Sequence, residues 1–68
     1  MDAKAIGQKL KDLRTQRNES QEEVAKNVGI SRSAIENYER GTRIPRDRTK
    51  RDLADYFDKS VEDIFFAK

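Results

Sequence analysis

The sequence predicts an all-α fold, a compact bundle of five helices, from three observations. Apolar residues recur at the three- and four-residue spacing of helices. At three predicted helix starts, Ser or Thr is followed three residues later by Glu or Asp, a pattern that caps helix N-termini. Glycines follow two of the periodic segments, where helices often end. With 68 residues, the chain is expected to form one domain over residues 1–68.

The first predicted helix follows Asp2, whose carboxylate is suited to capping its N-terminus. Ile6, Leu10 and Leu13 lie at positions i, i+4 and i+7 and form one apolar stripe. The helix is expected to end near Arg17, and its stripe should pack against the rest of the bundle.

Two short helices follow, separated by a tight turn. Ser20 and Glu23 form a capping box at the start of the second helix, which Gly29 should end. Ser31 caps the third helix, and Gly41 should end it in the same way. Their inward-facing side chains are expected to be Val24, Ala25, Val28, Ile35 and Tyr38. The hydroxyl of Tyr38 is expected to remain in contact with solvent.

The fourth helix has two possible starts. It begins either just after Pro45 or at Thr49, where the sequence Thr49-x-x-Asp52 offers a capping pattern. Ser60 and Asp63 cap a short final helix. The predicted core consists of Ile6, Leu10, Leu13, Val24, Ala25, Val28, Ile30, Ile35, Ile44, Leu53, Ala54, Phe57, Val61, Ile64 and Phe65.

The composition argues against several classes of protein. There is no Cys and no His, so neither disulfides nor a structural zinc site is expected, and we expect no cofactor. The chain contains no apolar run long enough for a membrane and no apolar signal-peptide core, which predicts a cytoplasmic protein. Without a glycine-rich phosphate loop or converging carboxylates, an enzyme is not expected.

The charges are segregated along the second half of the chain. Residues 40–51 carry six bases and one acid, a balance of +5, whereas residues 52–63 carry one base and five acids, a balance of −4. The first block is suited to meet phosphate and the second to avoid it. The alternative is that mixed charges only keep a small domain soluble.

The second and third helices, with the turn Gly29-Ile30-Ser31, predict a helix-turn-helix over residues 20–41. Ala25 is small where the helices cross, and Ile35 fills the space between them. The sequence Ser20-Gln-Glu-Glu-Val-Ala, continued by Gly29-Ile-Ser-Arg-Ser-Ala-Ile-Glu-Asn-Tyr-Glu-Arg-Gly41, resembles the lambda-repressor-like family of Xre or Cro/C1 type. The resemblance extends over about residues 6–66.

The resemblance implies a sequence-specific transcriptional regulator, a repressor or an activator, that binds double-stranded DNA with its third helix in the major groove. Arg32, Ser33 and Asn37 match base-contacting positions. Arg32 suits guanine and Asn37 suits adenine, although Arg32 could instead contact phosphate. Glu36 either accepts a hydrogen bond from cytosine or holds Arg32 as an ion pair, and the second is favoured because phosphates repel a carboxylate.

Other matching positions are expected to contact the DNA backbone or to support the fold. Gln21 lies at the N-terminus of the second helix, where free N–H groups favour an anion. Ser31, which caps the third helix, is also expected to contact the DNA backbone. Arg14 and Glu39 match a structural ion pair between the first helix and the end of the third. The arginines assigned to phosphate, or to a neighbouring minor groove, are Arg40, Arg43 and Arg46.

The chain departs from the family pattern at three positions. Glu19 replaces an apolar residue before the Ser20 cap, and Asp47 and Lys50 replace apolar residues of the fourth helix. The core near the fourth helix should therefore be thin. Either this helix starts late, or dimer contacts compensate.

Specific binding by so small a domain favours a homodimer on a palindromic operator with half-sites about 34–36 Å apart. Phe65 and Phe66 are adjacent and cannot share one helix face, so Phe66 is expected to form a dimer contact with Ile64 and Ala67. Two alternatives remain: a DNA-binding antitoxin or controller with a second protein partner, and a bundle that binds only protein.

Overall fold

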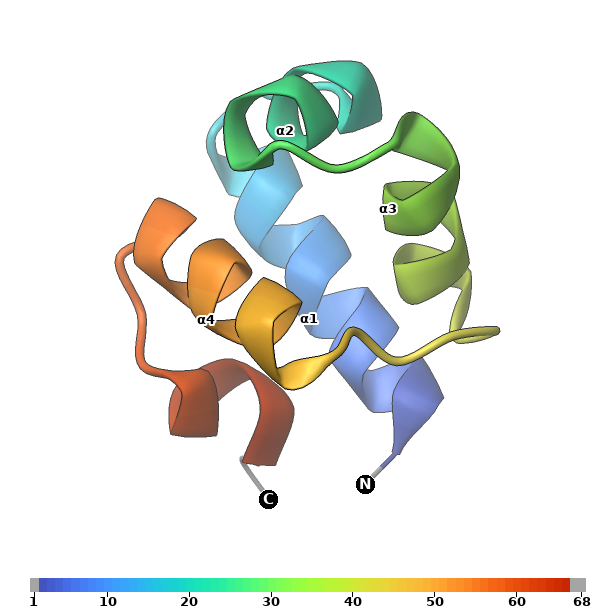
Figure 1. The fold of residues 1–68 in the computed structure, drawn as a ribbon, viewed down its shortest axis with the longest axis vertical. Coiled ribbons are helices and arrows are strands. Elements are labelled where there is room, and N and C mark those ends of the chain that lie inside the picture. Colours follow the sequence, from blue (N-terminus) through green and yellow to red (C-terminus); the bar gives the residue numbers. More distant parts are fainter. Residues whose placement is uncertain (1, 67–68) are drawn as a thin grey trace.

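The structure, a computed structural model, describes residues 2–66 and consists of helices joined by short loops (Figure 1). The helices are α1 (Ala3–Gln16), α2 (Gln21–Val28), α3 (Arg32–Arg40), α4 (Asp47–Tyr56) and the short π-helical segment η1 (Glu62–Phe66). Within the described residues there is no strand. The predicted all-α class with five helices is confirmed.

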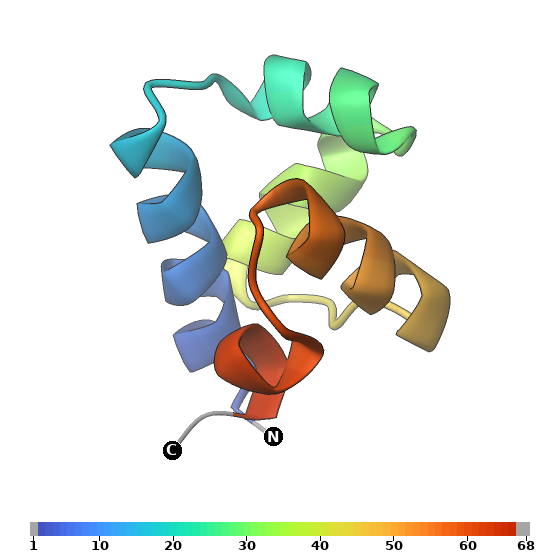
Figure 2. The same cartoon turned by 90° about the vertical axis from the view of Figure 1, so that its left-hand side faces the viewer.

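The helices pack around α1. α1 has its largest interface with α3, and α2 contacts both α3 and α4. α2 lies at the C-terminal end of α1, whereas η1 lies beside its N-terminal end, as the two perpendicular views show (Figures 1 and 2). The helix-turn-helix is therefore held from one side by α1 and from another by α4.

The predicted caps form. The Asp2 carboxylate accepts from the backbone N–H groups of Lys4 and Ala5 at 3.0 and 3.3 Å. Ser20 and Glu23 make a reciprocal capping box, and the Ser31 hydroxyl oxygen accepts from the backbone of α3 at 3.0 Å. The glycines that end α2 and α3 have φ of 86° and 81°, the left-handed conformation that favours this residue.

The core is close to the predicted one. The buried apolar residues are Ile6, Leu10, Val24, Ala25, Ile35, Tyr38, Leu53, Ala54, Phe57, Ile64 and Phe65, with Leu13, Val28, Ile30 and Val61 packed partly buried against them. The prediction for Ile44 is wrong, because its side chain is 40% exposed. Its neighbour Pro45 is buried instead.

The fourth helix starts early. Arg46 is its N-cap residue and makes no side-chain capping bond, so α4 begins two residues after Pro45 and Thr49 lies inside it. Lys50 then occupies a buried position with its ammonium 3.7 Å from the Asp47 carboxylate. The same ammonium lies 5.3 and 6.0 Å from the ring centres of Phe66 and Phe65. The aliphatic stem of Lys50 thus fills the space where the sequence predicted a thin core.

Glu19, the other charged departure, belongs to a polar cluster. Its carboxylate accepts from the Tyr56 hydroxyl and lies 3.3 Å from the Arg17 guanidinium. Arg17 covers the Tyr56 ring at 4.8 Å and donates to the Tyr56 carbonyl at 2.6 Å. The Asn27 amide donates to the Tyr56 hydroxyl at 3.1 Å. The cluster ties the loop between α1 and α2 to the end of α4, as an apolar contact would.

The final turn differs from an ordinary helix but is capped as predicted. The Ser60 hydroxyl oxygen accepts from the Asp63 backbone at 3.0 Å, and the Asp63 carboxylate accepts in return at 3.4 Å. Both Ile64 and Phe65 are buried, each 3% exposed. The assignment of Ile64 to a dimer contact is therefore corrected, because its side chain is part of the core. Ala67, assigned with it, lies outside the described residues.

Gly7 has a structural role that the sequence did not indicate. It is buried in α1, where α1 meets the C-terminal end of α3. A Cβ atom at this position would lie 2.5 Å from the Glu39 carbonyl oxygen and would also collide with that of Tyr38. The absence of a side chain therefore lets the two helices approach closely.

Candidate nucleic-acid interface

The N-terminal half of α3 presents an exposed polar surface. The Arg32 side chain, in the first turn, is 63% exposed, and Ser33 beside it is also exposed. Asn37 lies farther along and is half-buried; its amide oxygen accepts from the Thr42 hydroxyl at 3.1 Å. Within residues 2–66, no hydrogen bond occupies the amide NH₂ of Asn37, so it is available as a donor. The three residues predicted to contact bases thus lie on one helix, with Arg32 the most accessible.

Glu36 holds two arginines on α3. One of its carboxylate oxygens lies 3.2 Å from Nε of Arg32, and the other lies 3.6 Å from an Nη of Arg40. The expected ion pair with Arg32 is present. The second ion pair, between Glu36 and Arg40, was not predicted. Through Glu36 it links Arg32, a candidate base contact, to Arg40, a candidate phosphate contact.

The Arg14–Glu39 ion pair forms as expected. Nε and an Nη of Arg14 donate to the two Glu39 oxygens at 2.7 and 2.9 Å, with only 13% and 6% of the side chains exposed. A third donor of Arg14 bonds the Glu19 carbonyl at 2.8 Å. The bond to Glu39 raises the pKa of Arg14 above its usual value, although partial burial acts against this. The pair fixes α1 to the end of α3 and to the loop before α2.

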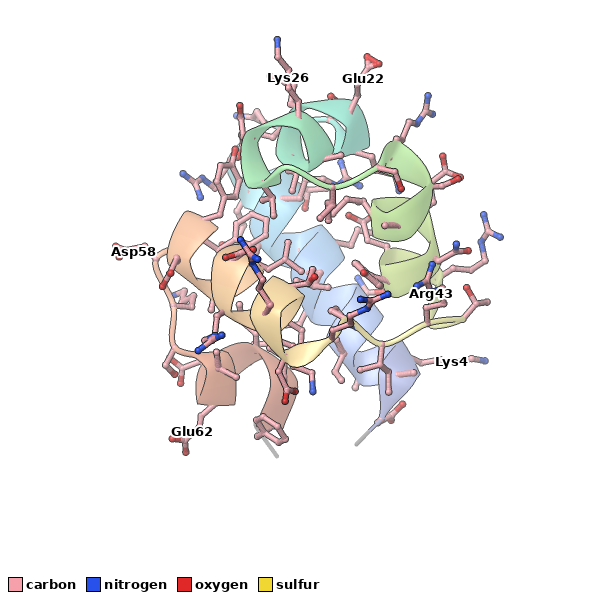
Figure 3. The ribbon with its side chains drawn as sticks, in the orientation of Figure 1. Lys4, Glu22, Lys26, Arg43, Asp58 and Glu62 are labelled. Carbon is pink, nitrogen blue, oxygen red and sulfur yellow. The ribbon has the colours of Figure 1, made fainter. Side chains whose placement is uncertain are left out.

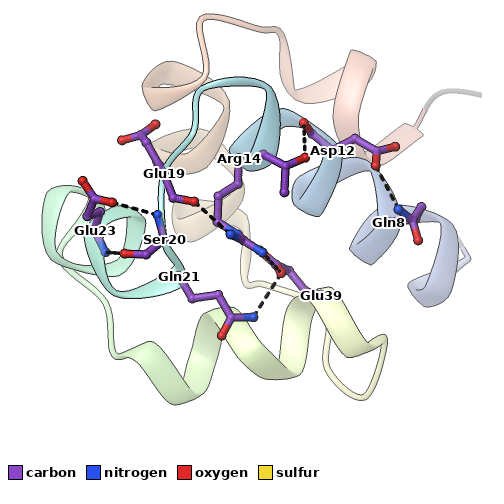
Figure 4. A network of polar contacts seen from close by, with 9 residues as sticks. Gln8, Asp12, Arg14, Glu19, Ser20, Gln21, Glu23 and Glu39 are labelled. Atoms are coloured by element: carbon purple, nitrogen blue, oxygen red, sulfur yellow. Dashed lines mark hydrogen bonds and ion pairs between the residues drawn. The ribbon is translucent and has the colours of Figure 1, made fainter.

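Gln21 is connected to this ion pair. Its amide donates to Glu39 at 3.1 Å, so Glu39 accepts from both Arg14 and Gln21 (Figure 4). Gln21 is the first residue of α2, where backbone N–H groups lack partners within the helix. The network therefore holds the predicted phosphate contact at a helix N-terminus beside α3.

A shallow hollow joins these elements. It is lined by Lys11, Arg14, Gln21, Arg32, Glu36, Glu39 and Arg40. Four cations and two carboxylates give it a net charge of +2. Lys11 was not assigned by the sequence, although it lies three residues before Arg14 and so on the same face of α1. The Arg14–Glu39 pair could have indicated it, because that pair brings this face of α1 to α3.

The basic segment 40–51 is less uniform than its sequence suggests. Arg43 and Arg46 are exposed in the loop between α3 and α4, and Arg43 lies beyond the end of α3 (Figure 3). By contrast, Lys50 is buried beside Asp47, and Arg48 lies 4.0 Å from Asp52. Ser31 is exposed, but its hydroxyl caps α3. Lys50 is therefore the base of this segment that burial withdraws, whereas Arg48 and Arg51 remain exposed on α4.

Comparison with known proteins identifies the family. The profile of a helix-turn-helix family matches residues 10–64. The chain belongs to this helix-turn-helix family. It is 34% identical over 56 residues to RstR, a transcriptional repressor of the cryptic phage CTXphi in Vibrio cholerae. That match takes in 82% of this chain but half of the relative's length.

A solved structure is also similar to this helix-turn-helix domain. The crystal structure of the restriction-modification controller protein C.AhdI from Aeromonas hydrophila superimposes with a TM-score of 0.87 and 34% identity. The match covers 94% of this chain and 97% of that one. The lambda-repressor-like resemblance is confirmed, and with it membership of a family of DNA-binding transcriptional regulators rather than enzymes. None of the helices in residues 2–66 has the length and apolar character needed to cross a membrane.

Proposed function

We propose that this helix-turn-helix protein is a sequence-specific transcriptional repressor that binds double-stranded DNA as a homodimer, with α3 in the major groove. The observation that carries the proposal is the exposed N-terminal face of α3 beside the positively charged hollow. In this docking mode, the N-terminal residues of the recognition helix contact base edges. The hollow then faces the adjoining phosphates.

Three residues are proposed to contact bases. Arg32 has the length and exposure to donate to O6 and N7 of a guanine. Ser33 lies beside it at the start of the helix. The NH₂ of Asn37 is suited to adenine N7, while Thr42 holds its oxygen.

The phosphate contacts are proposed to lie on both sides of α3. Gln21 and Lys11 lie in the hollow on one side, and the exposed Arg43 and Arg46 lie in the loop on the other. Arg40 lies at the end of the helix between them, and the Ser31 region supplies backbone donors at its start. These contacts position the helix and make affinity fall steeply with salt.

The homodimer is proposed to form through Phe66. This side chain is 54% exposed and lies in a depression with Lys50, Arg51 and Val61. Exposure of an aromatic ring to water is unfavourable, so this ring is suited to pack against a second copy of the chain. Two half-sites about 34–36 Å apart would then form a palindrome.

The test is selection of bound sites from random DNA duplexes. The expected result is an inverted repeat, with an Arg32→Ala variant relaxing the preference at one G·C pair and losing about 1–3 kcal/mol. The control is the same selection with Glu62→Gln. Because Glu62 lies far from α3 (Figure 3), this variant should select the same sequence as the wild type. Binding without any enriched sequence would contradict sequence-specific recognition. If Arg32→Ala weakened all duplexes equally, Arg32 would contact only phosphate.

The similarity to a restriction-modification controller favours a second candidate function. In this alternative, the protein controls the expression of a paired system and has the same DNA contacts. Mapping the selected site onto the source genome separates the two. A site upstream of the protein's own gene and a linked nuclease gene would support the controller function.

A further inference from the structure

Glu36 occupies an unusual place for a carboxylate, at the centre of the surface proposed to enter the groove. Arg32, Glu36 and Arg40 follow one another at four-residue intervals and therefore lie along one face of α3. Each carboxylate oxygen of Glu36 serves a different arginine, at 3.2 and 3.6 Å. The acid is 35% exposed, and its two partners are 63% and 64% exposed.

These ion pairs contribute little to the stability of the fold. Exposed pairs of this kind are weak in water, because solvent screens them and long side chains lose freedom. They are therefore easily exchanged when a competing anion approaches. DNA phosphates are such anions, and both arginines are proposed to meet DNA.

The geometry of the Arg32 pair distinguishes two ways of meeting DNA. The contact of Arg32 with Glu36 is made through Nε, and within residues 2–66 neither terminal nitrogen of the guanidinium makes a hydrogen bond. Those nitrogens are the donors that a guanine O6 and N7 require. Arg32 can thus bind guanine while Glu36 still neutralises and orients it.

On other sequences, Arg32 has no guanine and turns to a phosphate. The Glu36 carboxylate then loses one of its two arginine partners while it lies near phosphates, and the remaining partner, Arg40, is itself proposed to contact phosphate, so the net effect on the carboxylate is repulsive. Glu36 therefore disfavours binding to the wrong sequences more than binding to the right one.

From this difference we propose that Glu36 is a specificity-determining residue, which lowers affinity for non-operator DNA because Arg32 can contact a guanine while it stays paired with Glu36 but must leave Glu36 to contact a phosphate. The proposal rests on the proposed function, because it assumes that α3 enters the groove. It assigns to one carboxylate a role in rejecting sequences rather than in contacting a base.

The experiment compares the wild type with Glu36→Gln on the selected operator and on a shuffled duplex of equal composition. The variant should bind the shuffled duplex about fivefold more tightly, the effect of removing one close charge repulsion in water. Its operator affinity should not rise in proportion, so the ratio of the two affinities should fall. The salt dependence on shuffled DNA should steepen by about one unit of slope.

Asp58→Asn is the matched control. It removes the same charge from an exposed residue after α4 that lies on the side of the molecule away from Arg43 (Figure 3). It should change both affinities alike and leave their ratio unchanged. An equal fall of the ratio in Asp58→Asn would mean that net charge alone is responsible and would overturn the proposal. Thermal unfolding should be nearly the same for all three proteins.

Two further results would overturn the proposal. One is an unchanged ratio in Glu36→Gln while the wild type discriminates, which leaves the proposed function intact. The other is a new preferred base at a position that Arg32→Ala does not affect, which would show that Glu36 contacts that base itself. If the wild type bound no duplex, the proposed function would fail, and this inference with it.

Discussion

At the scale of single residues, two charged side chains act as parts of the core boundary. The Lys50 side chain is only 10% exposed, and its ammonium pairs with Asp47 and lies 6.0 and 5.3 Å from the ring centres of Phe65 and Phe66. Glu19 bonds Tyr56 where the family has an apolar residue. Both positions show that a charged residue type can still make a packing contact when its charge has a nearby partner.

The Tyr56 hydroxyl predicts a measurable pH dependence. Its hydrogen bond to Glu19 raises the pKa of Tyr56 above the ordinary 10.0, while the bond from Asn27 acts against this. A phenol with a raised pKa in the folded state stabilises the fold fully below pH 10, and this contribution is lost as the pH rises through the folded value.

Urea unfolding of the wild type and Tyr56→Phe at a series of alkaline pH values measures the contribution of the Tyr56 hydroxyl to the free energy of unfolding. The wild type should lose stability relative to the variant above pH 10, because the variant has no phenol to ionise. Glu19→Gln serves as the control. In this background, Tyr56→Phe should change the pH dependence of the free energy of unfolding less than it does in the wild type. Parallel profiles for the wild type and Tyr56→Phe would show that the Glu19 bond does not affect the titration.

At the scale of elements, the close contact of α1 and α3 positions the interface. The Arg14–Glu39 pair and the lack of a side chain at Gly7 both act at this contact. Through Glu39, the contact also holds Gln21 at the start of α2. The residues of α1, α2 and α3 that are proposed to contact phosphate thus depend on one helix pair.

Gly7→Ala tests how tight this contact is. An alanine ordinarily stabilises a helix interior, but here its Cβ would collide with backbone carbonyl oxygens of α3, which cannot move aside as a side chain can. The expected loss is about 1–3 kcal/mol. Thermal unfolding should show a Tm lower by about 4–8 °C for each kcal/mol.

Gln16→Ala, at the exposed end of α1, is the control and should change stability by less than about 0.5 kcal/mol. A higher Tm for Gly7→Ala would mean that α1 and α3 can separate without cost. Such a result would also weaken the argument that their contact positions Gln21.

At the scale of the whole molecule, charge is distributed between two sides. The hollow and the arginines of the α3–α4 loop form a basic side. The acidic residues Asp58 and Glu62 lie on the side opposite Arg43 in Figure 3. Such a distribution favours an approach to DNA with α3 leading and leaves the η1 end for a protein contact.

Phe66→Asp tests the proposed dimer. A charge in place of a ring that is 54% exposed should prevent self-association while leaving the fold intact, because this side chain is not part of the core. Sedimentation should change from dimer to monomer, and operator binding should weaken. Ile44→Asp, at the other exposed large apolar residue of residues 2–66, should remain dimeric. A wild type that sediments as a monomer at high micromolar concentration would exclude the Phe66 dimer.

The sequence alone predicted the features that depend on neighbouring residues. Asp2, Ser20 and Ser31 cap the helices as expected, and Gly29 and Gly41 end them. These signals act within a few residues of the backbone, so no distant contact is needed to interpret them. The helix-turn-helix follows from their spacing, and the resemblance then supplied the Arg14–Glu39 pair.

Only the tertiary structure decided which side chains face inward where the local pattern is ambiguous. Ile44 is exposed beside a buried Pro45, Lys50 is buried despite its charge, and Ile64, which the sequence assigned both to the core and to a dimer contact, lies in the core. The same packing brings Lys11 to the hollow and a second arginine to Glu36. These outcomes depend on how helices that are distant in sequence meet, because burial is set by the opposing surface and not by the residue type alone.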